Sequence, residues 1–239
     1  MQLDILGAQW ISGEPYAYEP EQTYYDECRR NHVVRASFEL ACVPKCAALT
    51  IAVMGYARVR INGTKVDESE LLGWWTNYSK RVYSYEVEVG SLLVTGQNSI
   101  EVELGNGFFN PSPLRLFGKY NLRERLAEVG TPRVLAALVA NDGEVLVKTD
   151  ETWTAHEGEL LFNNVYLGEV RDLRPRKLNN PKVHIWDEAR SVEPSPVAPC
   201  VRGAVVNPVR IFSHEDKTVI VFGEVVAGFC RLRLRAHEG

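Results

Sequence analysis

The residues whose spacing could support catalysis are four glutamates in alternating sequence, Glu86, Glu88, Glu101 and Glu103. In an extended strand every second side chain points to the same side, so each pair of carboxylates would share one face. Two carboxylates on one face can act as general acid and general base. The same spacing is more typical of the solvated side of an amphipathic strand, and we favour that interpretation.

Histidine and cysteine chemistry has little support in the sequence. The histidines are scattered, and neither a G-x-S-x-G nucleophile motif nor a glycine-rich phosphate loop occurs. The cysteines are odd in number and irregular in spacing, and no histidine pair lies at zinc-ligand distance. We therefore predict free thiols in a reducing compartment at Cys28, Cys42, Cys46, Cys200 and Cys230.

Aromatic residues cluster more tightly, with Trp74, Trp75, Tyr78, Tyr83 and Tyr85 close together in the chain. Sugar-binding proteins stack the apolar face of a pyranose on an aromatic ring, which makes Trp74 and Trp75 candidate carbohydrate-binding residues. The alternative is that they fill the core or a domain interface. We favour that structural role for both tryptophans.

Composition limits the remaining classes. The 239-residue chain is 45% hydrophobic and 24% charged, as in ordinary soluble globular proteins. No apolar run approaches the roughly 18 residues of a membrane span. The net charge of -4 and the lack of clustered lysine and arginine argue against nucleic acid. We therefore expect neither nucleic-acid nor membrane partners. The first residues do not resemble a secretion signal, so we expect a cytoplasmic location.

Short segments rich in β-branched and aromatic residues, separated by turn residues, dominate from Ser37 onward. This pattern predicts an all-β, antiparallel sandwich, with Asn62-Gly63 at a hairpin turn. One short helix is predicted at Asn121–Glu128. The predicted strands are Ser37–Leu40, Ala47–Met54, Ala57–Ile61, Arg81–Val87, Ser99–Leu104, Arg133–Val139, Glu144–Lys148, Val209–Phe212, Thr218–Val221 and Phe229–Arg235.

Proline content divides the chain. Residues 173–208 contain Pro175, Pro181, Pro194, Pro196, Pro199 and Pro208 and show little periodicity. Proline fixes φ and cannot donate to a central ladder, which favours an extended connector. We therefore predict a first domain at 1–172, a Pro-rich connector at 173–208 and an incomplete second β unit at 209–239. The apolar strands of that unit would dock on the first domain or associate between chains. We favour association, which would give a homo-oligomer.

Several short motifs occur in order along the chain and together resemble a known family. They are Ile61-Asn62-Gly63-Thr64, Gly73-Trp74-Trp75-Thr76-Asn77-Tyr78, Leu92-Leu93 with Gly96-Gln97-Asn98, Leu104-Gly105-Asn106-Gly107-Phe108-Phe109, Thr149-Asp150-Glu151-Thr152-Trp153, Phe162-Asn163-Asn164-Val165-Tyr166-Leu167-Gly168-Glu169 and Val221-Phe222-Gly223-Glu224. In this order they resemble the N-terminal, non-catalytic region of bacterial α-L-rhamnosidases of glycoside hydrolase family 78.

The resemblance implies a galactose-binding-like jelly-roll β-sandwich, followed by the start of a second β-sandwich unit that leads to an (α/α)₆ catalytic barrel. Members of the family hydrolyse glycosides by inversion, using two carboxylates on that barrel. No helical pattern of that size occurs in this chain, so no catalytic residue can be assigned and we expect the chain alone to be inactive.

Some relatives carry a calcium-dependent, rhamnose-binding module at this jelly roll. The residues that best resemble its site are Asn106, Asn163 and Asn164 for carbohydrate, with Asn106, Asn164 and Glu169 for a metal. Amide and carboxylate oxygens are ligands that calcium accepts. The alternative is that these asparagines and glycines simply form turns, and we favour it. We therefore expect no cofactor; the one candidate would be a calcium ion at Asn106, Asn164 and Glu169. Any binding of L-rhamnose should be millimolar.

Three functions remain open. The first, which the resemblance implies, is an accessory region of an α-L-rhamnosidase-like hydrolase that is truncated before the barrel. This region would be either structural or weakly sugar-binding, and in the second case its ligand would be a rhamnose-containing carbohydrate. The alternative is a free-standing carbohydrate-binding β-sandwich protein. A complete small β enzyme is the third reading, which the absence of a convergent acid, base and nucleophile set disfavours.

Overall fold

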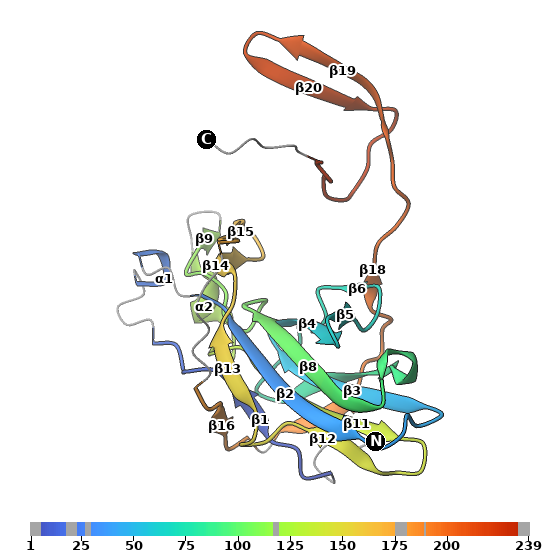
Figure 1. The fold of residues 1–239 in the computed structure, drawn as a ribbon. Helices are drawn as coiled ribbons and strands as arrows, with labels where there is room; N and C mark the ends of the chain where they lie inside the picture. The colour runs from blue at the N-terminus through green and yellow to red at the C-terminus, as the bar shows by residue number, and fades with distance from the viewer. Residues whose placement is uncertain are drawn as a thin grey trace. The chain divides into compact units, whose positions relative to one another are not determined.

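The computed structural model describes residues 6–17, 23–26, 30–116, 120–174, 181–188 and 190–233. It divides into two compact units, residues 1–201 and residues 202–239. The first unit is built around two β-sheets packed face to face (Figure 1). Among the described residues, no helix has the length and apolarity that a membrane span requires.

The larger sheet, sheet A, has the order β16-β1-β11-β3-β7-β17, with β12 also paired to β11. Its ladders are antiparallel except for β17, which runs parallel to β7. Its strands are β1 (Trp10–Ser12), β3 (Ala47–Met54), β7 (Arg81–Glu88), β11 (Arg133–Ala140), β12 (Val145–Lys148), β16 (His184–Trp186) and β17 (Ser191–Pro194).

The smaller sheet, sheet B, has the order β13-β2-β8-β4-β5 and is antiparallel throughout. Its long ladders join β2 to β8 and β8 to β4, which places sequence-distant side chains opposite one another. Its strands are β2 (His32–Leu40), β4 (Tyr56–Ile61), β5 (Thr64–Lys65), β8 (Gly96–Gly105) and β13 (Thr154–Glu157).

The main core lies between the two sheets. Alternate residues of β4 and β8, such as Val59 and Val102, meet Ile51 and Ala136 of sheet A in one buried cluster. A second apolar cluster, which includes Met54, covers the other face of sheet A. Sheet A is therefore buried on both sides, which explains why β3 and β11 are apolar at nearly every position.

The remaining elements are short. Two-stranded ladders join β6 (Ser69–Glu70) to β18 (Cys200–Val201), β9 (Arg115–Leu116) to β10 (Tyr120–Asn121), β14 (Leu160–Asn164) to β15 (Gly168–Arg171) and β19 (Pro208–His214) to β20 (Lys217–Phe222). The helical segments are α1 (Thr23–Asp26), α2 (Leu122–Arg125) and the 3₁₀ turn η2 (Gly90–Leu92). The predicted helix at 121–128 is thus a single turn, which its few residues cannot extend without tertiary support.

The prediction of an all-β sandwich is confirmed, and so is the hairpin at Asn62-Gly63. Ile61 pairs with Thr64, and the two turn residues have φ of 50° and 78°, the left-handed values that Asn and Gly tolerate. The Asn62 side chain also holds β8, because its Oδ1 accepts from the Ser99 backbone N–H at 2.9 Å.

The segment predicted as an extended connector contributes strands to the first unit. Within 173–208, strands β16, β17 and β18 pair with β1, β7 and β6 of the first unit. Exposed strand edges accept extended segments even where prolines interrupt them, because an edge strand needs only one set of ladder hydrogen bonds. The first unit therefore extends to residue 201, beyond the predicted boundary at 172. Pro175 lies outside the described residues.

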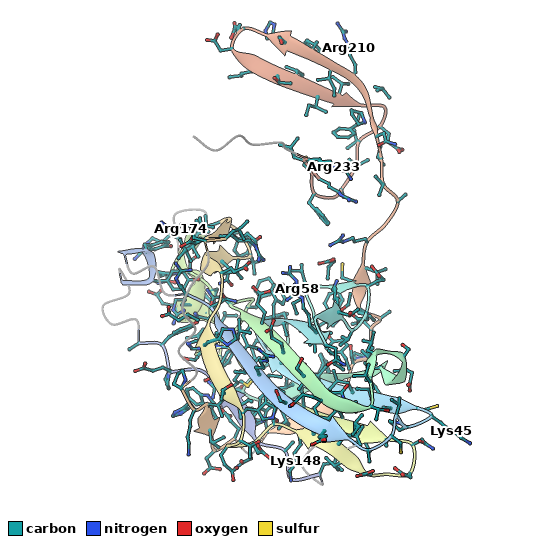
Figure 2. The ribbon with its side chains drawn as sticks, in the orientation of Figure 1. Lys45, Arg58, Lys148, Arg174, Arg210 and Arg233 are labelled. Carbon is teal, nitrogen blue, oxygen red and sulfur yellow. The ribbon has the colours of Figure 1, made fainter. Side chains whose placement is uncertain are left out.

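The second unit holds the predicted strands of its hairpin but not the third one. β19 and β20 pair around a turn at Glu215, whereas residues 229–233 are not in a strand. The prediction for Phe229–Arg235 is therefore wrong over its described part; Leu234 and Arg235 lie outside it. Side chains stand on both sides of the hairpin (Figure 2), and Val209 and Ile211 are 68% and 60% exposed. Association through these strands stays a prediction.

Four of the five predicted free cysteines lie among the described residues. Cys42, Cys46, Cys200 and Cys230 are free and exposed, and Cys28 lies outside the described ranges.

Candidate functional site

A cleft of about 280 Å³ lies on the outer face of sheet B, the face turned away from sheet A. Its floor is formed where β4 begins and β8 ends. Tyr56 lies opposite Gly105 in the ladder, and Arg58 lies opposite Glu103. Because side chains alternate along a strand, these four residues share the outer face, while Ala57 and Leu104 between them face inward. Gly105 has no side chain, which leaves the cleft open above β8.

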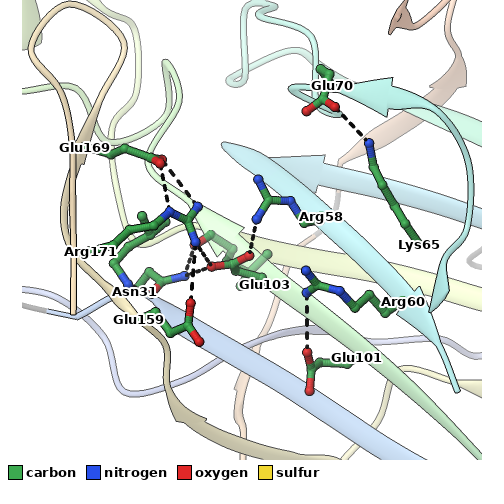
Figure 3. Close-up of polar contacts among 12 residues, drawn as sticks. Asn31, Arg58, Arg60, Lys65, Glu70, Glu101, Glu103, Glu159, Glu169 and Arg171 are labelled. Atoms are coloured by element: carbon green, nitrogen blue, oxygen red, sulfur yellow. Dashed lines mark hydrogen bonds and ion pairs between the residues drawn. The ribbon is translucent and has the colours of Figure 1, made fainter. Parts of the chain in front are cut away.

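Glu103 is the centre of the charged floor (Figure 3). Its carboxylate accepts from Arg58 Nη1 at 3.1 Å and from Asn31 Nδ2 at 3.4 Å, and it lies 3.7 Å from Arg171 Nη1. The Glu103 side chain is only 10% exposed. A buried carboxylate needs such partners, because its desolvation would otherwise be strongly unfavourable.

The β14–β15 hairpin forms one wall of the cleft. It contributes Asn163 and Asn164 from β14 and Glu169 and Arg171 from β15. Arg171 Nε donates to Glu169 Oε1 at 2.8 Å, and its Nη1 lies 3.7 Å from Glu159. The hydrogen bond to Glu169 is the main cause of the raised pKa of Arg171. Arg171 therefore stays charged and is held by three carboxylates.

The opposite wall is the segment 65–72, which begins with the last residue of β5 and contains β6. Lys65 Nζ lies 3.2 Å from Glu70 Oε1 across this segment. Asp67 turns back on the chain, where its Oδ1 accepts from the Ser69 N–H at 3.0 Å and from the Ser69 hydroxyl at 2.5 Å. The β6–β18 ladder, with Glu70 opposite Cys200, fixes the position of this wall.

Tyr56 supplies the aromatic part of the cleft. Burial is the main cause of the raised pKa of this phenol, and the nearby Tyr166 and Cys200 contribute to it. At neutral pH its hydroxyl is therefore protonated and can donate a hydrogen bond. The cleft thus combines one ring with several fixed donors and acceptors, which suits a small polyhydroxylated ligand.

The structure brings together the asparagines that the sequence singled out. Asn106 Nδ2 donates to the Asn163 carbonyl at 2.8 Å, and the Asn106 N–H donates to Asn163 Oδ1 at 2.6 Å. Asn164 Oδ1 accepts from the backbone N–H groups of Tyr166 and Leu167 at 2.8 and 3.1 Å. Asn163 and Asn164 line the cleft, whereas Asn106 lies behind them and supports the hairpin.

The predicted calcium ligands do not fit a metal in this arrangement. The Asn106 Oδ1 accepts from Asn110 Nδ2 at 2.8 Å, the Asn164 Oδ1 caps the hairpin loop, and Glu169 pairs with Arg171. Each oxygen that would bind calcium is therefore engaged with a protein donor. Nor do the described residues contain a group of three or more His, Cys, Asp or Glu side chains able to hold a metal ion.

Trp74 and Trp75 lie in the loop before β7 and do not line the cleft. They are 38% and 56% exposed, so the prediction of a core position is wrong, and the alternative of a domain interface stays a prediction. The loop has no strand periodicity that would direct either side chain inward. Trp75 contacts Phe108 edge to face, and Phe108 contacts Tyr166 in the same manner, with ring centroids 6.3 Å apart in both pairs.

The glutamates considered for catalysis fall in two environments. Glu86 and Glu88 are exposed, in agreement with the solvated interpretation. Glu103 is buried in its ion pairs, which the strand pattern could not indicate. Sequence reasoning also missed Tyr56, Arg58 and Arg171 as cleft residues; the alternation through Arg58 and Glu103 placed each on an outer face, but only the β4–β8 register brings them together.

The family model for the α-L-rhamnosidase N-terminal domain matches residues 43–212. An α-L-rhamnosidase of Formosa agariphila is 29% identical over 206 residues, which are 81% of this chain and 22% of that protein. One from Streptomyces avermitilis is 26% identical over 210 residues, 81% of this chain and 20% of that protein. This chain therefore spans about a fifth of the length of these relatives.

Solved structures agree with the fold. The native α-L-rhamnosidase of Aspergillus terreus superposes with a TM-score of 0.75 at 22% identity, covering 92% of this chain and 26% of that one. The Streptomyces avermitilis enzyme complexed with L-rhamnose gives a TM-score of 0.66 at 20% identity, covering 80% and 20%. The fold class is thus a rhamnosidase-type N-terminal β-sandwich. The chain belongs to the α-L-rhamnosidase N-terminal domain family. Members of this domain family form a non-catalytic, accessory region, and so does this chain.

Proposed function

We propose that this region serves an α-L-rhamnosidase-like glycoside hydrolase by binding rhamnose-containing carbohydrate in the cleft on sheet B. The observation that carries the proposal is the cleft itself, in which Tyr56 lies beside the fixed polar groups of Glu103, Arg58 and Asn163. Small-molecule sites have this composition, an apolar surface with a few oriented polar groups. At about 280 Å³ the cleft is suited to about one sugar residue.

The charged pairs of the floor support binding to a diol. In a guanidinium–carboxylate pair such as Arg58 with Glu103, a donor and an acceptor lie side by side. Neighbouring hydroxyl groups on a sugar ring can add to such a pair, because each hydroxyl both donates and accepts. Charge-assisted hydrogen bonds of this kind are stronger than neutral ones.

A substitution at Gly105 tests the site. A Cβ there would contact Asn163 Oδ1 at 3.4 Å and Tyr56 Cβ at 3.5 Å, and Gly105 has no positive φ, so the backbone accepts a side chain. We expect Gly105→Val to fill the cleft and to abolish the heat of L-rhamnose binding in titration calorimetry. Gly203→Val is the matched control, since a Cβ at Gly203 meets nothing within 4 Å. Equal binding by both variants would exclude this cleft.

Hydrolysis is proposed only for the complete protein. We expect the chain alone to show no turnover of aryl α-L-rhamnosides, because the resemblance places the two catalytic carboxylates of the family on a helical barrel and not on the β-sandwich. Reproducible turnover by a pure preparation that binds L-rhamnose would contradict this assignment.

A further inference from the structure

The cations that line the cleft are already neutralised. Arg58 lies 3.1 Å from Glu103, Lys65 lies 3.2 Å from Glu70, and Arg171 lies 2.8 Å from Glu169. Arg171 is also shared with Glu103 and Glu159, at 3.7 Å each. An anion could therefore reach these three cations only beside carboxylates that already pair with them.

Carboxylates outnumber cations along the cleft walls. Beside Glu70, Glu103 and Glu169, the lining includes Asp67, which has no ion pair with any described residue. Its carboxylate is held only by the amide and hydroxyl of Ser69. The lining residues therefore carry at least one uncompensated negative charge, and Asp67 is where that charge lies.

An anionic ligand would meet two penalties. It would be repelled by Asp67, since like charges a few ångströms apart destabilise each other in a partly desolvated site. To gain an ion pair it would have to compete with Glu103 for Arg58 or Arg171, and Glu103, whose side chain is only 10% exposed, would lose part of its compensation. A neutral sugar meets neither penalty, because its hydroxyl groups can add to the existing pairs.

We propose that the cleft selects neutral saccharides and excludes saccharides that carry a carboxylate, with Asp67 as the specificity-determining residue. This inference rests on the proposed function, since it names the ligand class of the same cleft. Asp67 acts by repulsion rather than by contact with the preferred ligand, which is a common source of specificity.

Titration calorimetry with L-rhamnose, D-galactose and D-galacturonic acid tests the inference. We expect D-galacturonic acid to bind at least about tenfold more weakly than the better neutral sugar, with a smaller difference at high salt because ions screen the repulsion. Asp67→Asn should narrow the difference between the affinities for D-galacturonic acid and for the neutral sugar, because it removes the charge while the amide oxygen can still accept from Ser69. Asp142→Asn is the matched control, because Asp142 is exposed in the β11–β12 turn.

The outcomes separate the two claims. Equal or tighter binding of D-galacturonic acid by the unmodified chain, beside measurable binding of a neutral sugar, would overturn the selectivity and leave the proposed function intact. If the difference in affinity between D-galacturonic acid and the neutral sugar were the same in Asp67→Asn and Asp142→Asn, the role of Asp67 would be overturned. If none of the three sugars bound, the proposed function would fail and the inference would fall with it.

Discussion

The two outer faces of the sandwich are built from the same kind of alternation but end in opposite environments. The outer face of sheet A is covered by an apolar cluster that includes Phe109, Tyr78 and Met54. The outer face of sheet B carries charged cross-strand pairs, Arg58 with Glu103 and Arg60 with Glu101, and holds the cleft. The comparison teaches that the covered face contributes to stability, whereas the open face leaves room for the cleft in which we propose that sugar binds.

The strand sequences already contain this difference. β11 reads RVLAALVA and is buried at every position, whereas β4 reads YARVRI and, from Arg58 to Ile61, alternates between partly exposed and buried residues. A strand that is apolar at both odd and even positions must be buried on both faces of its sheet. A strand that alternates apolar and polar residues needs burial on one face only. Substitutions on the two faces should therefore differ in their effect on the free energy of unfolding.

The largest effect is expected at the cover of sheet A. Phe109 is fully buried, with its ring 5.0 Å from that of Tyr78. Phe109→Ala should lower the free energy of unfolding by about 3–5 kcal/mol, because it leaves a cavity as well as losing apolar contacts. Val170→Ala in the β14–β15 hairpin, which forms a wall of the cleft on the open face, should cost less than about 0.5 kcal/mol, since Val170 is 53% exposed. Urea denaturation measures both, and similar losses would refute the contrast.

Ion pairs should show the same contrast with a smaller effect. Arg133 pairs with Glu188, its guanidinium lies 3.6 Å from the centre of the Trp186 ring, and burial lowers its pKa to about 10. Arg133→Ala should cost about 2–3 kcal/mol; Arg190 still pairs with Glu188 and limits the loss. Arg60→Ala should cost less than about 1 kcal/mol, because Arg60 is partly exposed. An equal loss in the free energy of unfolding for Arg133→Ala and Arg60→Ala would show that burial does not determine how much an ion pair contributes.

The buried interior of the sandwich should disfavour a charged side chain, and the protonation of His32 tests this. His32 is 8% exposed and burial lowers its pKa to about 4. The unfolded chain binds this proton near pH 6.5 and the folded chain does not, so stability is full above pH 6.5 and falls as the pH drops toward 4. The loss should reach at most about 3 kcal/mol over this range.

Replacement of His32 by glutamine should flatten this part of the stability profile, as measured by urea denaturation from pH 7 to pH 4. The exposed His184 provides the matched control. If His184→Gln flattened the profile as much as His32→Gln, the effect would not arise from burial.

Much of the fold followed from local pattern, and most of the site did not. The predicted bounds of β3 match the structure because an apolar run between turns is a local signal, and Asn62-Gly63 fixed its hairpin for the same reason. β16, β17 and β18 were missed because edge pairing depends on where the sheets end, which no short pattern encodes. The cleft needed the register of Arg58 with Glu103 and the reach of Arg171 from a distant hairpin.

The exposure of Trp74 and Trp75 has a similar origin. Gly73 has φ of 116°, and its missing side chain allows close approach of the Gly55 carbonyl. That turn directs the following loop away from the core, and a run of aromatic residues gives no sign of it.

The central claim is that the open face of sheet B, and no other surface, binds the sugar. Titration of the isotope-labelled chain with L-rhamnose, followed by amide chemical-shift changes in two-dimensional NMR, tests it most directly. We predict that the changes concentrate at Tyr56, Arg58 and Gly105 and in the β14–β15 hairpin, and that β11 and the β19–β20 hairpin stay unchanged. Changes centred on β19–β20 or on Trp74 and Trp75, with the cleft amides unmoved, would contradict the account.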